Sequence, residues 1–255
     1  MSKAGDVYEN PVTGERVVVR AGTEDTGGGH LVVDLYVAPG GAAAGEHVHQ
    51  DIEETFTVVR GRVGFRLDGR EDVAGLTRRF VVPPGVVHDW WNAGKEEAHV
   101  IVELRGEIGR LERFEMMIST LYGLARDGKT DARGRPRILQ TSLLAREFDD
   151  VITFTRPPRF VQRLLFGTLA PVAHLLGYHG AYPEYGPSGF TDVEPWQGRI
   201  EALNQPGLEL RRPAMESRRR RRSVRYERTG RHGSAEPLKD RQQCQRRTAR
   251  PRSCG

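Results

Sequence analysis

Short runs of alternating apolar and polar residues fill the N-terminal part of the chain, and glycine, proline and Asp-Gly turns separate them. A period of two is typical of strands that are buried on one face. Many such strands, with no helical pattern between them, favour a β-sandwich or barrel. We expect strands at residues 16–20, 31–37, 54–59, 62–67, 79–82, 88–91 and 98–104.

The pattern changes after Gly106, where apolar residues recur three or four positions apart. This period predicts helices. The first ends near Gly128, and the second covers about 138–148. The third, at 159–176, begins after two prolines and is interrupted or kinked at Pro171. It is too broken to span a bilayer, and packing on the barrel is favoured over an interfacial position.

Basic residues are concentrated at the C-terminal end of the chain. Residues 211–255 carry a net charge of +12. The whole chain carries +5, so the net charge of residues 1–210 is −7. Few large apolar residues and no hydrophobic period occur there, so we expect residues 214–255 to form a disordered, Arg-rich tail. The tail could bind nucleic acid, be a solvated appendage or result from a shifted reading frame. Because only Tyr226 could stack on a base, the last two interpretations are favoured over nucleic-acid binding.

Both cysteines, Cys244 and Cys254, fall in this tail and lack the spacing of a zinc site. No apolar segment follows Met1, which predicts that there is no signal peptide. We therefore expect a cytoplasmic location.

Four residues that can ligate a metal recur in the β-rich part of the chain. His47 and His49 are two positions apart, so in a strand both imidazoles project from one face, about 6.6 Å apart. A polar turn leads to Glu54, whose strand can return a carboxylate to the same point, and His88 follows a Pro-Gly turn. Imidazole and carboxylate together suit several divalent metals.

Residues 41–61 read G-x5-H-x-H-x4-E-x6-G and resemble the first motif of the cupin superfamily. The second cupin motif, G-x5-P-x-G-x2-H-x3-N, is matched from Pro83 onward, and Thr77 replaces its leading glycine. The resemblance covers about residues 30–105. It implies one divalent metal ion, Fe(II), Mn(II), Ni(II) or Zn(II), held by His47, His49, Glu54 and His88.

Glu53 also follows His49 at a spacing that cupins permit, so the two glutamates compete as ligands. Gly61 stands at the motif's glycine position when Glu54 is the ligand, whereas Arg60 stands there when Glu53 is the ligand. Alternation places Glu54 on the same face as Phe56. We therefore expect Glu54 to be the ligand and Glu53 to be solvated.

The resemblance implies a mainly β fold, the double-stranded β-helix or jelly-roll barrel of cupins, with the metal at its mouth. We expect this barrel at 8–106 and an α-helical extension packed on it at 107–186. An irregular segment at 187–213 would then precede the disordered tail at 214–255.

Alternation with the expected ligands indicates which residues line a substrate pocket. They are Phe56 and Val58 beside Glu54 and Trp90 beside His88, and the neighbouring strand adds Tyr36 or Leu35. Such a pocket suits a small, apolar or aromatic organic substrate. The resemblance extends to quercetin-dioxygenase-like cupins, which implies a mononuclear metal-dependent oxygenase in which Glu54 could also act as a base.

Two other functions stay open, because the fold does not choose the reaction. The barrel could bind or sense a small molecule without catalysis. It could also be a metal-assisted isomerase or cyclase that does not use O2. The family resemblance allows a homodimer, although no residue demands one.

Overall fold

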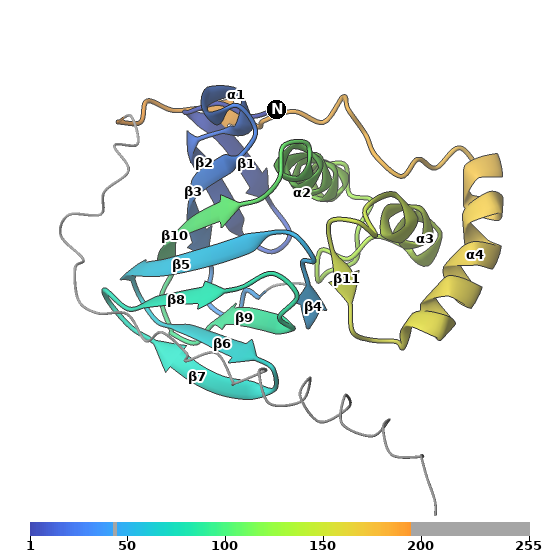
Figure 1. Cartoon of the computed structure of the whole chain (residues 1–255). Helices are drawn as coiled ribbons and strands as arrows, with labels where there is room; N and C mark the ends of the chain where they lie inside the picture. The colour runs from blue at the N-terminus through green and yellow to red at the C-terminus, as the bar shows by residue number, and fades with distance from the viewer. Residues whose placement is uncertain (43–44, 195–255) are drawn as a thin grey trace, which may run out of the picture. The chain divides into compact units, whose positions relative to one another are not determined.

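The computed structural model describes residues 1–42 and 45–194, so the predicted tail and most of the segment 187–213 lie outside the described residues. Two antiparallel sheets carry the β structure (Figure 1). The seven-stranded sheet has the order β12 (Gly189–Phe190), β1 (Asp6–Asn10), β2 (Glu15–Ala21), β3 (His30–Val37), β10 (Ala98–Arg105), β5 (Glu53–Arg60) and β8 (Arg79–Val82). The five-stranded sheet has the order β11 (Thr153–Phe154), β4 (His47–Val48), β9 (His88–Asn92), β6 (Val63–Leu67) and β7 (Arg70–Ala74).

The described residues also form the helices α1 (Thr23–Thr26), α2 (Arg110–Arg126), α3 (Ile138–Glu147) and α4 (Arg159–Leu175). The three longer helices agree with the helical periods in the sequence. Pro171 lies inside α4 without interrupting it. The expected cupin-type fold, mainly β with two antiparallel sheets and followed by helices, is confirmed.

The hydrophobic core follows the alternation along the strands. In β3 the residues that face the core are Leu31, Val33, Leu35 and Val37. Leu35 pairs in register with Val100 of β10, and Val58 of β5 is also a partner of Val100. Apolar residues at every second position therefore meet across three neighbouring strands, which explains why these segments form strands.

Four strands escaped the sequence patterns, because they lack this alternation. β7 has exposed residues at four of its five positions, so it has no buried face to reveal it. β11 and β12 are two residues long, and β1 is mostly polar. A strand of this kind forms because a neighbouring strand supplies its hydrogen-bond partners.

The helical extension is tied to the barrel at two places. α2 packs beside β1, and the buried carboxylate of Glu115 accepts hydrogen bonds of 2.6–3.1 Å from the backbone and hydroxyl groups of Ser2 and Thr23. Beyond α3, β11 adds to the five-stranded sheet, where Phe154 is the register partner of His47. The extension therefore contributes to the sheet that carries two of the expected ligands.

The tyrosine-rich loop at 177–186 packs on the helices of the extension. The hydroxyl of Tyr182 donates to the side-chain oxygen of Gln140 in α3 at 2.8 Å. Tyr185 lies so close to Gly123 of α2 that a Cβ there would be 2.1 Å from its Cγ. Gly123 is thus required by close packing.

Two turn residues of the expected motifs have positive φ angles. Gly61 has φ 84°, and a Cβ atom added to it would lie 3.0 Å from Cα of Ala98. The position therefore requires glycine. Thr77, which replaces the leading glycine of the second motif, has φ 64°. The turn therefore keeps the conformation of a glycine turn, and a β-branched residue is held in it.

Thr77→Gly should raise the free energy of unfolding by about 0.5–1 kcal/mol, because glycine adopts this conformation without a steric penalty. The gain is reduced by the greater freedom of glycine in the unfolded chain. Thr77→Asn should give a smaller gain and Thr77→Ser almost none. Urea denaturation of the three variants would measure this order, and a loss of stability in the glycine variant would contradict it.

A polar network lies on the face of the seven-stranded sheet opposite the core. The carboxylate of Asp34 accepts hydrogen bonds from Nε of Arg20 at 2.5 Å and from Nε2 of His99 at 2.7 Å. Burial would raise the pKa of Asp34, but the bonds from His99 and Arg20 outweigh it and hold the pKa below its usual value. Asp34 is thus ionised and stabilises the folded state at neutral pH.

Asp34→Asn should lower the free energy of unfolding at pH 7 by about 2 kcal/mol, because two hydrogen bonds to a charged acceptor are weakened. A carboxylate with a lowered folded pKa stabilises the protein above its unfolded pKa of about 4, and this contribution is lost as the pH falls through the folded pKa. The difference from the unsubstituted protein should therefore shrink below about pH 4. Urea denaturation across this pH range tests this, with the exposed Asp72→Asn as control.

Candidate metal centre

Four buried side chains gather where β4, β5 and β9 meet: His47, His49, Glu54 and His88. Each offers one ligand atom, and these atoms all lie within 4.8 Å of one another. His47 and His88 are register partners in the five-stranded sheet, and Glu54 comes from β5 of the other sheet. Glu53 is not in the cluster. The sequence motif therefore folds into a compact set of donors that joins the two sheets.

Each histidine of the cluster bonds a backbone carbonyl oxygen through Nδ1. The distances are 2.8 Å from His47 to Gly45, 2.7 Å from His49 to Val151 and 3.1 Å from His88 to Val86. Because a carbonyl oxygen only accepts, Nδ1 must carry the proton. In the neutral form each ring would therefore present an unprotonated Nε2, which is the form that binds a metal.

The carboxylate of Glu54 faces these nitrogens. Its Oε2 is 2.9 Å from Nε2 of His88, and its Oε1 is 3.9 Å from Nε2 of His49. Among the described residues, neither Oε2 of Glu54 nor Nε2 of His88 has an aligned hydrogen-bond partner. Buried polar atoms without partners are costly, and imidazole with carboxylate is a donor set that divalent metals favour. The cluster therefore fits a single metal ion.

The pKa values of the cluster reflect burial and mutual contact. Burial and the neighbouring His88 and His49 lower the pKa of His47 to about 3. Burial would raise the pKa of Glu54, but the charge of His49 and the contact with His88 lower it to about 2. Burial lowers the pKa of His88, but the neighbouring Glu54 outweighs this and raises it. The cluster thus combines an ionised carboxylate with a neutral His47.

The helical extension supplies part of the surroundings of these ligands. The carbonyl of Val151, which lies between α3 and β11, accepts the hydrogen bond from His49. The ring centroid of Phe154 is 6.0 Å from that of His47, and Phe114 of α2 meets His49 edge-on at 5.7 Å. The sequence patterns did not single out Val151 and Phe154, because a backbone carbonyl and a two-residue strand leave no signal in side-chain type or period.

A cavity of about 1220 Å³ opens beside the cluster, and His47, His49 and Glu54 form part of its wall. Its volume is above the usual range of about 300–1,000 Å³ for sites that bind small ligands. The barrel contributes apolar and aromatic side chains, and so does the extension. Among them are Leu35, Phe56, Trp90, Phe114, Ile118 and Phe148. The cavity thus lies between the barrel and the extension.

The structure places two of the expected pocket residues outside this cavity. Phe56 and Trp90 lie in the cavity wall, but Tyr36 and Val58 do not. Tyr36 stacks on His99 at 4.4 Å on the opposite face of the sheet, because the odd-numbered residues of β3 face the core. Leu35 lies in the cavity wall in its place, and Val58 is fully buried in the core.

Glu15 of β2 is a polar residue of the cavity wall that the sequence patterns did not single out. Its Oε2 accepts hydrogen bonds from the hydroxyls of Thr13 at 3.1 Å and Tyr122 at 3.2 Å. Burial raises the pKa of its carboxyl group above the usual value. The wall of the apolar cavity therefore contains the polar side chain of Glu15 in addition to the residues of the cluster.

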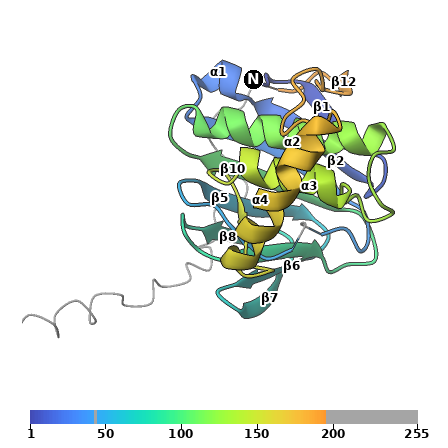
Figure 2. The same cartoon turned by 90° about the vertical axis from the view of Figure 1, so that its right-hand side faces the viewer.

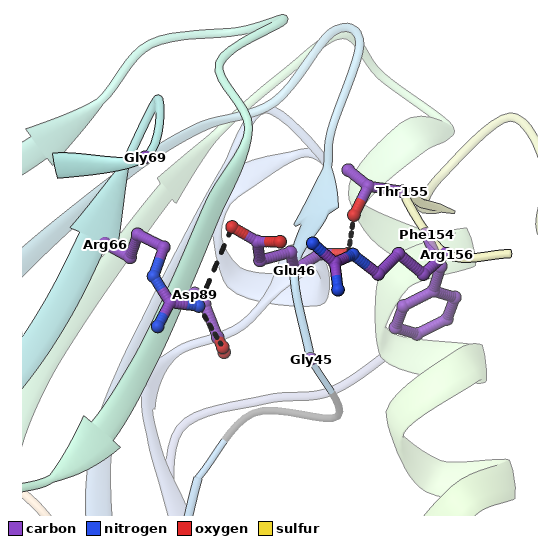
Figure 3. Close-up of a pocket in the computed structure, with 8 residues that line it drawn as sticks. All are labelled: Gly45, Glu46, Arg66, Gly69, Asp89, Phe154, Thr155 and Arg156. Carbon is purple, nitrogen blue, oxygen red and sulfur yellow. Dashed lines mark hydrogen bonds and ion pairs between the residues drawn. The ribbon is translucent and has the colours of Figure 1, made fainter. Parts of the chain in front are cut away.

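A second pocket, of about 650 Å³, lies beside β4 and β11 (Figure 3). Arg66 reaches the carboxylates of Glu46 and Asp89 there, at 3.6 and 3.9 Å. Phe154 and Arg156 lie in the walls of both this pocket and the larger cavity. The segment around β11 is therefore shared between the two spaces.

Comparison with known proteins identifies the barrel. Residues 34–103 match the family described as Cupin domain. No curated protein matches the chain. The matched segment contains all four residues of the cluster, whereas the helical extension lies outside it.

Several solved structures are similar to part of this chain at low sequence identity. KdgF from Halomonas sp. is 19% identical with a TM-score of 0.35, over 39% of this chain and 87% of that one. The RmlC-like cupin from Shewanella frigidimarina is 18% identical with a TM-score of 0.35, over 40% of this chain and 85% of that one. The Cnp3 cupin domain from Schizosaccharomyces pombe is 13% identical with a TM-score of 0.34, over 40% of this chain and 71% of that one.

The family match and the two antiparallel sheets together show that this chain contains a cupin domain with a possible His/Glu metal site.

Phe154→Ala should weaken the binding of a divalent metal about tenfold, because it removes the ring that packs against His47. Isothermal titration of the metal-free protein would measure the dissociation constant. Phe190→Ala, in the exposed strand β12, is the matched control and should leave the constant unchanged. An unchanged constant in the Phe154 variant would show that the extension does not support the ligands.

Proposed function

We propose that this protein is a mononuclear metal-dependent oxygenase that acts on a small, apolar or aromatic organic substrate. The observation that carries this proposal is the position of the cluster. Three of its four members form part of the wall of a large cavity that is lined by aromatic and aliphatic side chains. A donor set at the surface of an apolar cavity is suited to bring a metal and an organic molecule together.

The proposed ligands of the metal are His47, His49, Glu54 and His88. A divalent ion held there would supply Lewis acidity and, with a redox-active metal such as Fe(II) or Mn(II), reactivity toward O2. Donation of Nδ1–H to the backbone fixes the orientation of each ring and directs Nε2 to the centre.

The cavity residues would bind and orient the substrate. Phe56 and Trp90, whose ring centroids are 6.3 Å apart, offer aromatic surface to a planar molecule. Glu15 would accept a hydrogen bond from a substrate hydroxyl, and Glu54 is the proposed base that takes a proton from a hydroxyl near the ligands. The apolar walls exclude water and strengthen these polar contacts.

A non-catalytic sensor is the second candidate, and one observation favours it. Val151 and Phe154 of the extension contact His49 and His47 directly, so a ligand that moved these histidines would also move the extension. A sensor needs this kind of connection between a binding site and a second part of the chain.

The double variant His47→Ala/His88→Ala should lose the bound metal, because two imidazole donors leave and the remaining two do not hold an ion. Metal analysis of protein purified without a histidine tag would measure this. His174→Ala, an exposed histidine outside the cluster, is the control and should keep its metal. Full metal content in the double variant would place the metal elsewhere.

Oxygen consumption with a panel of flavonoids, diketones and catechols tests the reaction. Turnover that is present in the unsubstituted protein and absent from the double variant supports an oxygenase. Tight binding of a panel member without oxygen uptake, for each of the candidate metals, would reject the oxygenase and support the sensor.

A further inference from the structure

The outer face of α4 is apolar and exposed. Phe160 is 74% exposed, Leu164 is 71% exposed and Leu175 is 86% exposed. Their spacing places them on one side of the helix together with Pro171. The band is widened by the exposed residues Leu165, Val172 and Leu176. Exposed apolar residues gathered in this way mark an interaction surface.

The packing of α4 on the rest of the protein does not use this band. α4 packs on α3, and the residues of α4 that are buried are Ala170 and Ala173, on the opposite face. Figure 2 shows α4 lying in front of α3 when the extension faces the viewer. The large apolar side chains of the helix are therefore available to a partner.

The ionisable side chains of α4 itself are all basic. No Asp or Glu occurs between Asp150 and Glu184. Arg163 and His174 flank the apolar band, and Arg159, at the start of the helix, contacts Asp149 at 3.1 Å. An exposed apolar face with basic flanks is the pattern of helices that lie in the interface of an anionic bilayer.

The band is also continuous with the large cavity. Leu165 is part of the band and of the cavity wall, and Phe166 beside it lines the cavity as well. Gln162 donates to the backbone carbonyl of Phe154 at 2.8 Å, which fixes α4 against β11. The same helix therefore faces solvent on one side and the cavity on the other.

We propose that α4 docks the protein on the surface of an anionic phospholipid bilayer, with its apolar band in the acyl–headgroup boundary and Arg163 at the phosphates. Pairing of α4 with α4 of a second copy would bring like charges together, whereas anionic lipid complements them. Within the described residues, no helix is long and apolar enough to cross a membrane. Docking would bring the cavity beside lipid, from which an apolar substrate could partition, and this consequence rests on the proposed function.

A tryptophan reporter tests the docking in the full chain. Phe160→Trp should shift its added emission to shorter wavelength on vesicles of phosphatidylcholine and phosphatidylglycerol, and brominated acyl chains should quench it. Leu76→Trp, at a 65% exposed position after β7, is the matched control and should show neither effect. A solvent-like emission from the Phe160 reporter on vesicles that carry bound protein would overturn the proposal.

A second pair of variants separates docking by α4 from attraction of the basic tail. In about 0.5 M salt, which screens exposed charges, Leu164→Glu/Leu175→Glu should lower vesicle binding about tenfold. The control Val73→Glu/Leu76→Glu should bind like the unsubstituted protein. Equal binding of both would assign the attraction to another part of the chain and overturn the proposal.

A blue shift of the Phe160 reporter that depends on protein concentration without vesicles would assign the band to a second copy and also overturn the proposal. These tests need no metal, so their failure is distinct from failure of the oxygenase proposal.

Discussion

The hydrogen bond from Nδ1 of His49 to the carbonyl of Val151 joins the barrel to the extension at the metal centre. β4, which carries His47 and ends just before His49, has only two residues and pairs with β9 at a single register position. β11 pairs with its other side. A strand this short cannot orient two ligands by its own ladder bonds. The extension therefore completes the sheet that holds the ligands.

The same contacts determine where the cavity lies. Because β11 is fixed beside β4, the helices on either side of it, α3 and α4, are held near the mouth of the barrel. Their side chains then close a space into which the cluster faces. Residues of both the barrel and the extension thus line the cavity. Its chemistry depends on residues outside the matched cupin segment.

Much of this could be predicted from the sequence, because the period of a buried strand and the spacing of ligands are local properties. The glycine spacing after Glu54 distinguished it from Glu53, and the structure brings Glu54 into the cluster. The sequence did not decide between Tyr36 and Leu35 as the residue that lines the cavity, because both faces of β3 carry large residues. Val151 and β11 could not be found, since a backbone carbonyl acts without regard to its side chain and the pairing spans a long stretch of chain.

The structure also indicates how an ion bound at the cluster would be coupled to the folded barrel. Three imidazoles and a carboxylate are buried together, and the backbone satisfies only the Nδ1 side of each ring. The remaining lone pairs cost free energy unless a cation binds them. An ion that binds only the folded chain stabilises it by about 2.7 kcal/mol at a hundredfold excess over its dissociation constant. Since the carbonyl of Val151 accepts the hydrogen bond from one of these rings, the stabilisation from such an ion would extend to the helical extension.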